Sequence, residues 1–255
     1  MSGEDFTGRT ALITGAASGI GKACAEWLDQ HGIAELVLVD LDGPGLEGLE
    51  LSCQRRHIVG DVADPELWAG IEAELPALHH AVINAGIANG CPLVDQDFGE
   101  WRRMLSVNLD GAFLGLRTAL RIMKKAGTGK SIVLTSSVAG VKPLPGTAAY
   151  GSSKAGVAHL ARIAAAEHAK DGIRVNAVAP GRVDTPIWGK TEGFRALAEQ
   201  LGSHEAAIAR LAAESTPLDR FATADELAGQ IGFLLSDAGA NITGTVLVSD
   251  GGYSL

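Results

Sequence analysis

Tyr150 and Lys154 stand four residues apart, and Ser137 precedes the tyrosine by thirteen positions, within the stretch SVAGVKPLPGTAAYGSSK. If Tyr150 opens a helix, this spacing places the phenol and the ammonium on one face, about one helical turn apart. A neighbouring ammonium favours the phenolate and lowers the pKa of a tyrosine below its ordinary value of about 10. Tyr150 could then exchange a proton with an alcohol or carbonyl oxygen. The alternative is a helix that carries a buried tyrosine and a solvated lysine without chemistry.

The composition limits the class of protein. The chain has 255 residues, 46% of them hydrophobic, which suits one large domain with its own core. Three scattered cysteines without CxxC spacing indicate neither disulfides nor a metal site. No apolar run approaches about 18 residues and segment 1–10 is polar, so we expect a cytoplasmic protein with no membrane partner. A net charge of −9 argues against nucleic acid as a partner.

A glycine-rich turn follows the first expected strand, residues 9–14, and leads into a helix that we expect to end at Gly32. Gly15, Gly19 and Gly21 form the pattern G-x-x-x-G-x-G, two residues wider at its start than the dinucleotide pattern G-x-G-x-x-G. Glycines here would let the backbone approach a pyrophosphate, which the N-terminal end of the helix attracts. Glycines also serve ordinary left-handed turns, so the loop alone leaves both interpretations open.

Asp40 ends the second expected strand, ELVLVD, 25 residues after Gly15. A carboxylate at this position can accept hydrogen bonds from both hydroxyls of an adenosine ribose and would repel a 2′-phosphate. Neither Ser18 nor Leu41 is a cation that could hold such a phosphate. The pattern therefore favours NAD over NADP, unless Asp40 is only an exposed residue at a strand end.

Strands and helices alternate along the rest of the chain, which predicts right-handed crossovers and a seven-stranded parallel sheet with helices on both faces. We find no linker and no second domain, so residues 1–255 form one doubly wound α/β domain. The remaining strands are expected to end at Asp61 and to span 79–86, 129–136, 173–181 and 244–252. The expected helices span 65–76, 98–125, 150–170 and 224–236, and a partly helical lid spans about 187–217.

Three polar residues lie at positions of the predicted fold where either a function or a purely structural role is open. Asp61 and Asn84 fall at carboxyl ends of strands, where open α/β sheets bind ligands, although either could instead form a turn. Asn108 lies inside the expected helix 98–125. Because an asparagine amide competes for backbone hydrogen bonds, this residue indicates either a bulge with a function or a tolerated surface position.

Taken together, these pieces resemble the short-chain dehydrogenase/reductase family, in its single-domain Rossmann branch, from end to end of the chain. The matching segments are TGAASGIG at 14–21, NAG at 84–86, VNLDG at 107–111, SSVAG at 136–140, YGSSK at 150–154, PGRVDTP at 180–186 and SDGG at 249–252. The resemblance implies hydride transfer between NAD and a secondary alcohol or ketone.

The resemblance also implies a role for individual residues. Tyr150 would be the catalytic acid and base, Lys154 would lower its pKa and bind the nicotinamide ribose, and Ser137 rather than Ser136 would hold the substrate oxygen. Asn108 would hold a water that links Lys154 to solvent. The residues implied to bind the cofactor are Gly15, Ser18, Gly19, Ile20, Gly21, Asp40, Leu41, Asp61, Val62, Asn84, Ala85, Gly86, Tyr150, Lys154, Pro180, Gly181, Val183 and Thr185.

The substrate is less well defined. Trp188, together with Val138, Leu144 and Phe194, could face an apolar pocket beside Ser137 and Tyr150, or could simply pack the lid. An NADPH-dependent reductase of ketones or 3-oxoacyl thioesters is the alternative enzyme, and a non-catalytic NAD-binding protein is a further one. The resemblance suggests a homotetramer, or else a homodimer, formed through the helices at 98–125 and 150–170.

Overall fold

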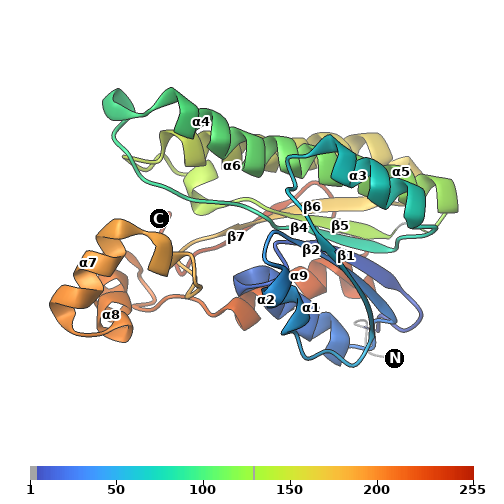
Figure 1. The fold of residues 1–255 in the computed structure, drawn as a ribbon, viewed down its shortest axis with the longest axis horizontal. Coiled ribbons are helices and arrows are strands. Elements are labelled where there is room, and N and C mark those ends of the chain that lie inside the picture. Colours follow the sequence, from blue (N-terminus) through green and yellow to red (C-terminus); the bar gives the residue numbers. More distant parts are fainter. Residues whose placement is uncertain (1–4, 129) are drawn as a thin grey trace.

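Seven parallel strands form one sheet with the order β3-β2-β1-β4-β5-β6-β7, in a computed structural model that describes residues 5–128 and 130–255 (Figure 1). The direction of strand addition reverses between β1 and β4. This arrangement confirms the predicted doubly wound α/β domain. The strands are β1 (Thr10–Thr14), β2 (Glu35–Asp40), β3 (Gln54–Val59), β4 (His80–Ile83), β5 (Ser131–Thr135), β6 (Arg174–Pro180) and β7 (Val246–Ser249).

Helices cover both faces of the sheet (Figure 1). One face carries α3 (Pro65–Glu74), α4 (Phe98–Leu105), α5 (Gly111–Ala126) and α6 (Ala148–His168), and the other carries α1 (Gly19–Gln30), α2 (Gly43–Glu47) and α9 (Ala224–Leu235). Successive strand residues point to opposite faces, so Leu12 joins the core under α3 and α5 while Ile13 joins the core under α1 and α9. Burial on both faces explains the nearly continuous apolar runs of the strands.

The long helix expected over 98–125 is interrupted. After α4 the chain makes a π-helical turn at Ser106–Asp110 before it continues as α5. Asn108 lies in this turn and is 1% exposed, so the bulge interpretation is confirmed and the surface interpretation is wrong.

Several boundaries differ from the predictions. Helix α6 begins at Ala148, two residues before Tyr150, and β3 ends at Val59, so Asp61 lies in the following turn. The short helix α2, capped by Asp42, was not predicted. The segment 187–217, which we expected to form a lid, contains α7 (Glu192–Leu201) and α8 (His204–Ser215), which lie together beside the C-terminal end of the chain (Figure 1).

Residues 1–4 and Gly129, the first residue of the expected fifth strand, lie outside the described residues. Within the ranges that the structure covers, none of the helices combines the length and the apolar character needed to cross a lipid bilayer.

Candidate active site

The carboxyl ends of the parallel strands bring the predicted residues to one edge of the sheet. Gly15 follows β1, Asn84 follows β4, and Ser137 lies two residues beyond β5. The register pairs Thr135 with Val178, and the Ser136 amide donates to the Val178 carbonyl at 2.8 Å, so the ends of β5 and β6 lie side by side. This is the edge at which open α/β sheets bind ligands.

The glycine-rich loop packs tightly against the start of α1. Gly15 and Gly19 have φ values of +67° and +55°, a region that favours glycine. A Cβ on Gly21 would lie 2.1 Å from the carbonyl oxygen of Gly15, which leaves no room for a side chain. Both features fit a loop that approaches a phosphate closely at a helix N-terminus.

Asp40 lies against the same loop. Its Oδ2 accepts a hydrogen bond of 2.9 Å from the amide of Ala17, and its Oδ1 accepts one from Asp42. From the opposite direction Thr185 reaches the loop, since a Cβ on Gly19 would lie 3.4 Å from Thr185 Cβ. The loop, the acidic residue that ends β2 and the segment after β6 are therefore brought together, as a dinucleotide site requires.

Two threonines missing from the predicted set connect this loop to Lys154. Asn84 donates to the carbonyl of Thr14 at 3.1 Å and accepts from the hydroxyl of Thr135 at 3.1 Å. The carbonyl oxygen of Thr135 in turn accepts a 2.8 Å hydrogen bond from Nζ of Lys154. Each threonine is the last residue of a strand, β1 or β5. That position is a sequence signal for both, and Thr14 is also the first residue of the matching segment TGAASGIG.

Asn108 holds the segment after β4 in place. Its Oδ1 accepts from the amide of Ile87 at 2.8 Å, while its Nδ2 donates to the Ile87 carbonyl at 2.9 Å and to the Ser153 hydroxyl at 3.1 Å. Gly86 passes so close that an added Cβ would lie 3.1 Å from Asn108 Oδ1 and 3.2 Å from Lys154 Nζ. The π-helical turn thus places Asn108 between α6 and the loop that approaches Lys154.

Tyr150 and Lys154 both lie on α6, with Nζ of the lysine 5.9 Å from the centre of the phenol ring. Lys154 is 4% exposed, and this burial lowers its pKa from 10.5 to about 8. Burial also raises the pKa of Tyr150 above its ordinary value, and only the hydroxyl of Ser137 acts to lower it. The predicted lowering of the tyrosine pKa by Lys154 is therefore not seen in this structure: the net shift is upward, because desolvation of the phenol outweighs its hydrogen bond with Ser137.

The structure distinguishes the two neighbouring serines. Ser136 is 2% exposed and its hydroxyl donates to the carbonyl of Lys154 at 2.7 Å, so it has a structural role. The Ser137 hydroxyl accepts from the amide of Ala139 and interacts with the Tyr150 side chain. Ser137 is the serine that can act together with the tyrosine.

Other predicted cofactor residues differ in their placement. Asp61 is exposed and accepts from the amide of Ala63, as in the turn interpretation. Val62 is 7% exposed, and its side chain packs in the core against Gly111. Leu41 is 68% exposed, and Ile20 packs against the core under α1 and α9.

Aromatic residues of the lid mainly pack against one another. The indole N–H of Trp188 donates to the carbonyl of Val183 at 2.7 Å, and its ring lies 5.5 Å from Phe194 and 5.2 Å from Phe221. These contacts support the packing interpretation for Trp188 and Phe194. Val138 is also buried, whereas Leu144 lines a shallow cavity of about 330 Å³ beside the start of α6.

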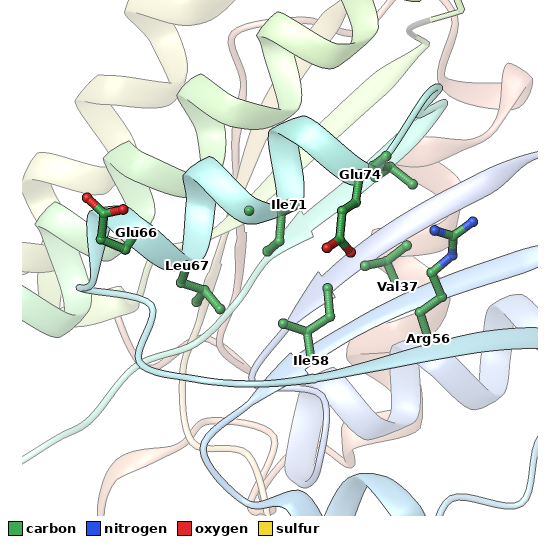
Figure 2. Close-up of a pocket in the computed structure, with 9 residues that line it drawn as sticks. Val37, Arg56, Ile58, Glu66, Leu67, Ile71 and Glu74 are labelled. Carbon is green, nitrogen blue, oxygen red and sulfur yellow. The ribbon is translucent and has the colours of Figure 1, made fainter.

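A second cavity, of about 260 Å³, lies between α3 and strands β2 and β3 (Figure 2). Arg56 and Glu74 stand at one end of it, and Leu67, Ile71 and Ile58 form its apolar wall. None of its lining residues belongs to the candidate active site.

No group of three or more metal-ligating side chains occurs in the described part of the chain.

Comparison with known proteins agrees with this geometry. Residues 15–254 match the family model described as enoyl-(acyl carrier protein) reductase. The chain is 37% identical to cis-4-hydroxycyclohexanecarboxylate dehydrogenase of Sinomonas cyclohexanicum, over 99% of both chains. It is 33% identical to 2,5-dichloro-2,5-cyclohexadiene-1,4-diol dehydrogenase of Sphingobium indicum, over 98% of this chain and 99% of the relative. The structure of L-sorbose reductase from Gluconobacter frateurii, solved with NADPH and L-sorbose, superposes with a TM-score of 0.90 at 28% identity and 98% coverage of each chain.

The chain belongs to the short-chain dehydrogenase/reductase family. It is an oxidoreductase that uses a nicotinamide cofactor to interconvert an alcohol and a carbonyl group. The glycine-rich loop and Gly86, where added side chains would collide, fit such a cofactor at the sheet edge.

Proposed function

We propose that this protein is an NAD-dependent dehydrogenase of secondary alcohols, with Ser137, Tyr150, Lys154 and Asn108 as its catalytic set. One observation carries the proposal: Tyr150 interacts with Ser137 and lies on the same helix as Lys154, whose ammonium is bonded to the carbonyl of Thr135. The glycine-rich loop reaches the same group of residues through Asn84.

When bound, NAD would supply the hydride acceptor. Tyr150 takes the hydroxyl proton at its phenol oxygen while Ser137 donates a hydrogen bond to the same substrate oxygen, so that a carbonyl group forms. Lys154 places its ammonium 5.9 Å from the centre of the Tyr150 ring and is itself held by the carbonyl of Thr135. Asn108 keeps Ile87 and Gly86 in place beside the ammonium.

The raised pKa of Tyr150 affects the direction of the reaction. At neutral pH the phenol is protonated, so Tyr150 can donate a proton to a carbonyl oxygen without further change. To accept a proton from an alcohol it must first ionise, and a higher pH favours that form. We therefore expect alcohol oxidation to increase with pH and carbonyl reduction to be favoured at lower pH.

The preference for NAD rests on Asp40. Its carboxylate is fixed at the glycine-rich loop by the Ala17 amide, where it would accept from ribose hydroxyls and repel a 2′-phosphate. The alternative, an NADPH-dependent ketone reductase, is favoured by the likeness to the L-sorbose reductase solved with NADPH. The negative charge of Asp40 argues against it.

For the substrate, we propose a secondary alcohol on a six-membered carbon ring. The names of both relatives above include such a ring, and the two chains match this one over nearly their full length.

Exposed apolar side chains on α4 and α5, Phe98 at 70% and Phe113 at 45%, support a homotetramer or homodimer formed through these helices.

The proposal is tested with Tyr150→Phe and a panel of cyclic secondary alcohols, with NAD reduction as the readout. The variant should lose at least about 100-fold in kcat, the usual contribution of a positioned acid or base. Its melting temperature and its affinity for NAD, measured by calorimetry, should stay close to those of the wild type. Full turnover by this variant would end the assignment of Tyr150, and a wild type inactive on every alcohol and ketone tested would favour a non-catalytic NAD-binding protein.

A further inference from the structure

Arg182, two residues beyond the end of β6, lies among three aromatic rings. Its guanidinium carbon is 5.6 Å from the ring centre of Trp188, 5.6 Å from that of Phe221 and 5.5 Å from that of Tyr253. Lys142 lies against the same Tyr253, with Nζ 5.5 Å from the ring centre and donating to the Tyr253 carbonyl at 3.0 Å. Two cations therefore share one tyrosine, and we call Arg182 and Lys142 the cation pair.

Arg182 has no acidic partner among the residues that the structure describes. Its Nε is buried and has no hydrogen-bond acceptor there. Two neighbouring acidic side chains are engaged elsewhere. Asp184, two residues along the chain, bonds His204 at 3.0 Å, and Asp250, which packs against Gly181, accepts from the amides of Gly252 and Ser254. Contacts with aromatic faces offset only part of the cost of removing a guanidinium from water, so the site is suited to an anion.

The cation pair lies next to the segments that follow β5 and β6, the first of which carries Ser137. Arg182 directly follows Pro180 and Gly181, at the end of the strand that pairs with β5. The amide of Lys142 donates to the carbonyl of Val138, the residue after Ser137, at 2.8 Å. The glycine-rich loop and Asp40 lie at the ends of β1 and β2, so the cation pair is placed to meet the substrate rather than the adenosine half of the cofactor.

We propose that Arg182, with Lys142 at the same tyrosine ring, binds a carboxylate of the substrate, so that the preferred substrate is a hydroxy acid. This inference rests on the proposed function, because it assigns a substrate class to the same site. A guanidinium can donate two parallel hydrogen bonds to a carboxylate, which fixes the orientation of the substrate as well as its position. The three aromatic rings hold the guanidinium in place before the substrate arrives.

The test compares cis-4-hydroxycyclohexanecarboxylate with its methyl ester, which keeps the hydroxyl group and lacks the charge. Wild type should have a kcat/KM for the acid roughly 10- to 100-fold above that for the ester, the range of one charge-assisted hydrogen-bonded contact. Arg182→Gln should remove this preference while oxidising the ester nearly as well as the wild type. Arg182→Lys should retain part of the preference, since the positive charge remains.

Arg210→Gln is the matched control, because Arg210 is an exposed arginine of the segment 187–217, outside the aromatic rings around Arg182, and pairs with Glu214 on its own helix. It should leave the acid-to-ester ratio unchanged. An acid-to-ester ratio in Arg182→Gln equal to that of the wild type would overturn the inference. If activity on acid and ester falls equally, Arg182 only supports the lid.

A binding measurement separates this inference from the proposed function. Cyclohexanecarboxylate lacks the reacting hydroxyl, so its binding, followed by calorimetry, does not depend on turnover. Binding to the wild type that is lost in Arg182→Gln supports the carboxylate site even if no alcohol is oxidised. Wild type that oxidises neutral cyclic alcohols but does not bind cyclohexanecarboxylate would overturn the inference and leave the proposed function intact.

Discussion

Asn108 and Ile87 are joined by two hydrogen bonds, one from the Ile87 amide to Oδ1 at 2.8 Å and one from Nδ2 to the Ile87 carbonyl at 2.9 Å. One side chain thus satisfies both backbone groups of a residue in an irregular segment. The π-helical turn makes this possible by turning a buried asparagine out of the regular helical pattern. The segment that it holds contains Gly86, the close neighbour of Lys154.

Asn108→Ala should reduce both stability and activity. The half-buried amide and carbonyl of Ile87 lose their partners, which we expect to cost about 2 kcal/mol in the free energy of unfolding. The released segment should also lower kcat by disturbing the position of Lys154. Urea unfolding and steady-state kinetics measure the two effects. Asn89→Ala, at an exposed position of the same segment, is the control and should change neither quantity.

Ser136 and Ser137 should respond in opposite ways to replacement by alanine. Ser137→Ala removes the hydroxyl that interacts with Tyr150, so kcat should fall about 100-fold while stability changes by less than about 1 kcal/mol. Ser136→Ala removes a buried hydrogen bond to the Lys154 carbonyl, so it should cost about 1–2 kcal/mol of stability with only a small change in kcat. The reverse outcome would assign the catalytic hydroxyl to Ser136.

Asp40→Asn should weaken the preference for NAD over NADP. The amide oxygen of asparagine can still accept from Ala17, so the variant removes the charge and keeps the bond to the glycine-rich loop, at the loss of the exposed bond from the Asp42 amide. We expect the ratio of kcat/KM for NAD to that for NADP to fall about tenfold, because a repulsion of about 1.4 kcal/mol is removed. Asp42→Asn removes a charge two residues away and keeps the cap of α2. An equal change in this control would show that only the net charge matters.

Much of the fold could be predicted from the sequence because local patterns and the final topology agree. The run ELVLVD is a strand with the predicted limits Glu35–Asp40, since it is apolar on both faces and bounded by turn-forming residues. The glycine-rich turn and the helix after it also occur as expected. Errors arose at boundaries: β3 ends at Val59, two residues before the predicted end at Asp61.

The candidate site was only partly predictable. Tyr150 and Lys154 share a helix, so their spacing alone brings them together. The bonds from Lys154 to Thr135 and from Asn108 to Ile87 use backbone carbonyls, which every residue has and no motif marks. The direction of the Tyr150 pKa shift depends on how deeply the phenol is buried, and that follows from the packing of the whole domain rather than from any spacing.

Lys154 is a buried cation whose pKa is lowered to about 8, against an ordinary value of 10.5 in an unfolded chain. Below pH 8 the lysine is charged in both states, and its burial reduces the stability of the fold by a constant amount. Between pH 8 and 10.5 the unfolded chain binds the proton that the folded chain has released, so the contribution of Lys154 to stability rises with pH. Above pH 10.5 the penalty has been relieved.

Lys154→Met should therefore be compared with the wild type across this range without nucleotide. The free energy of unfolding of the variant minus that of the wild type should fall by about 3 kcal/mol between pH 7 and pH 10.5, because the variant has no proton to release. Urea unfolding at half-unit intervals of pH measures this difference. Lys170→Met, at an exposed lysine outside the site, controls for the loss of one lysine. A difference for Lys154→Met that stays constant with pH would show that Lys154 keeps an ordinary pKa in the folded protein.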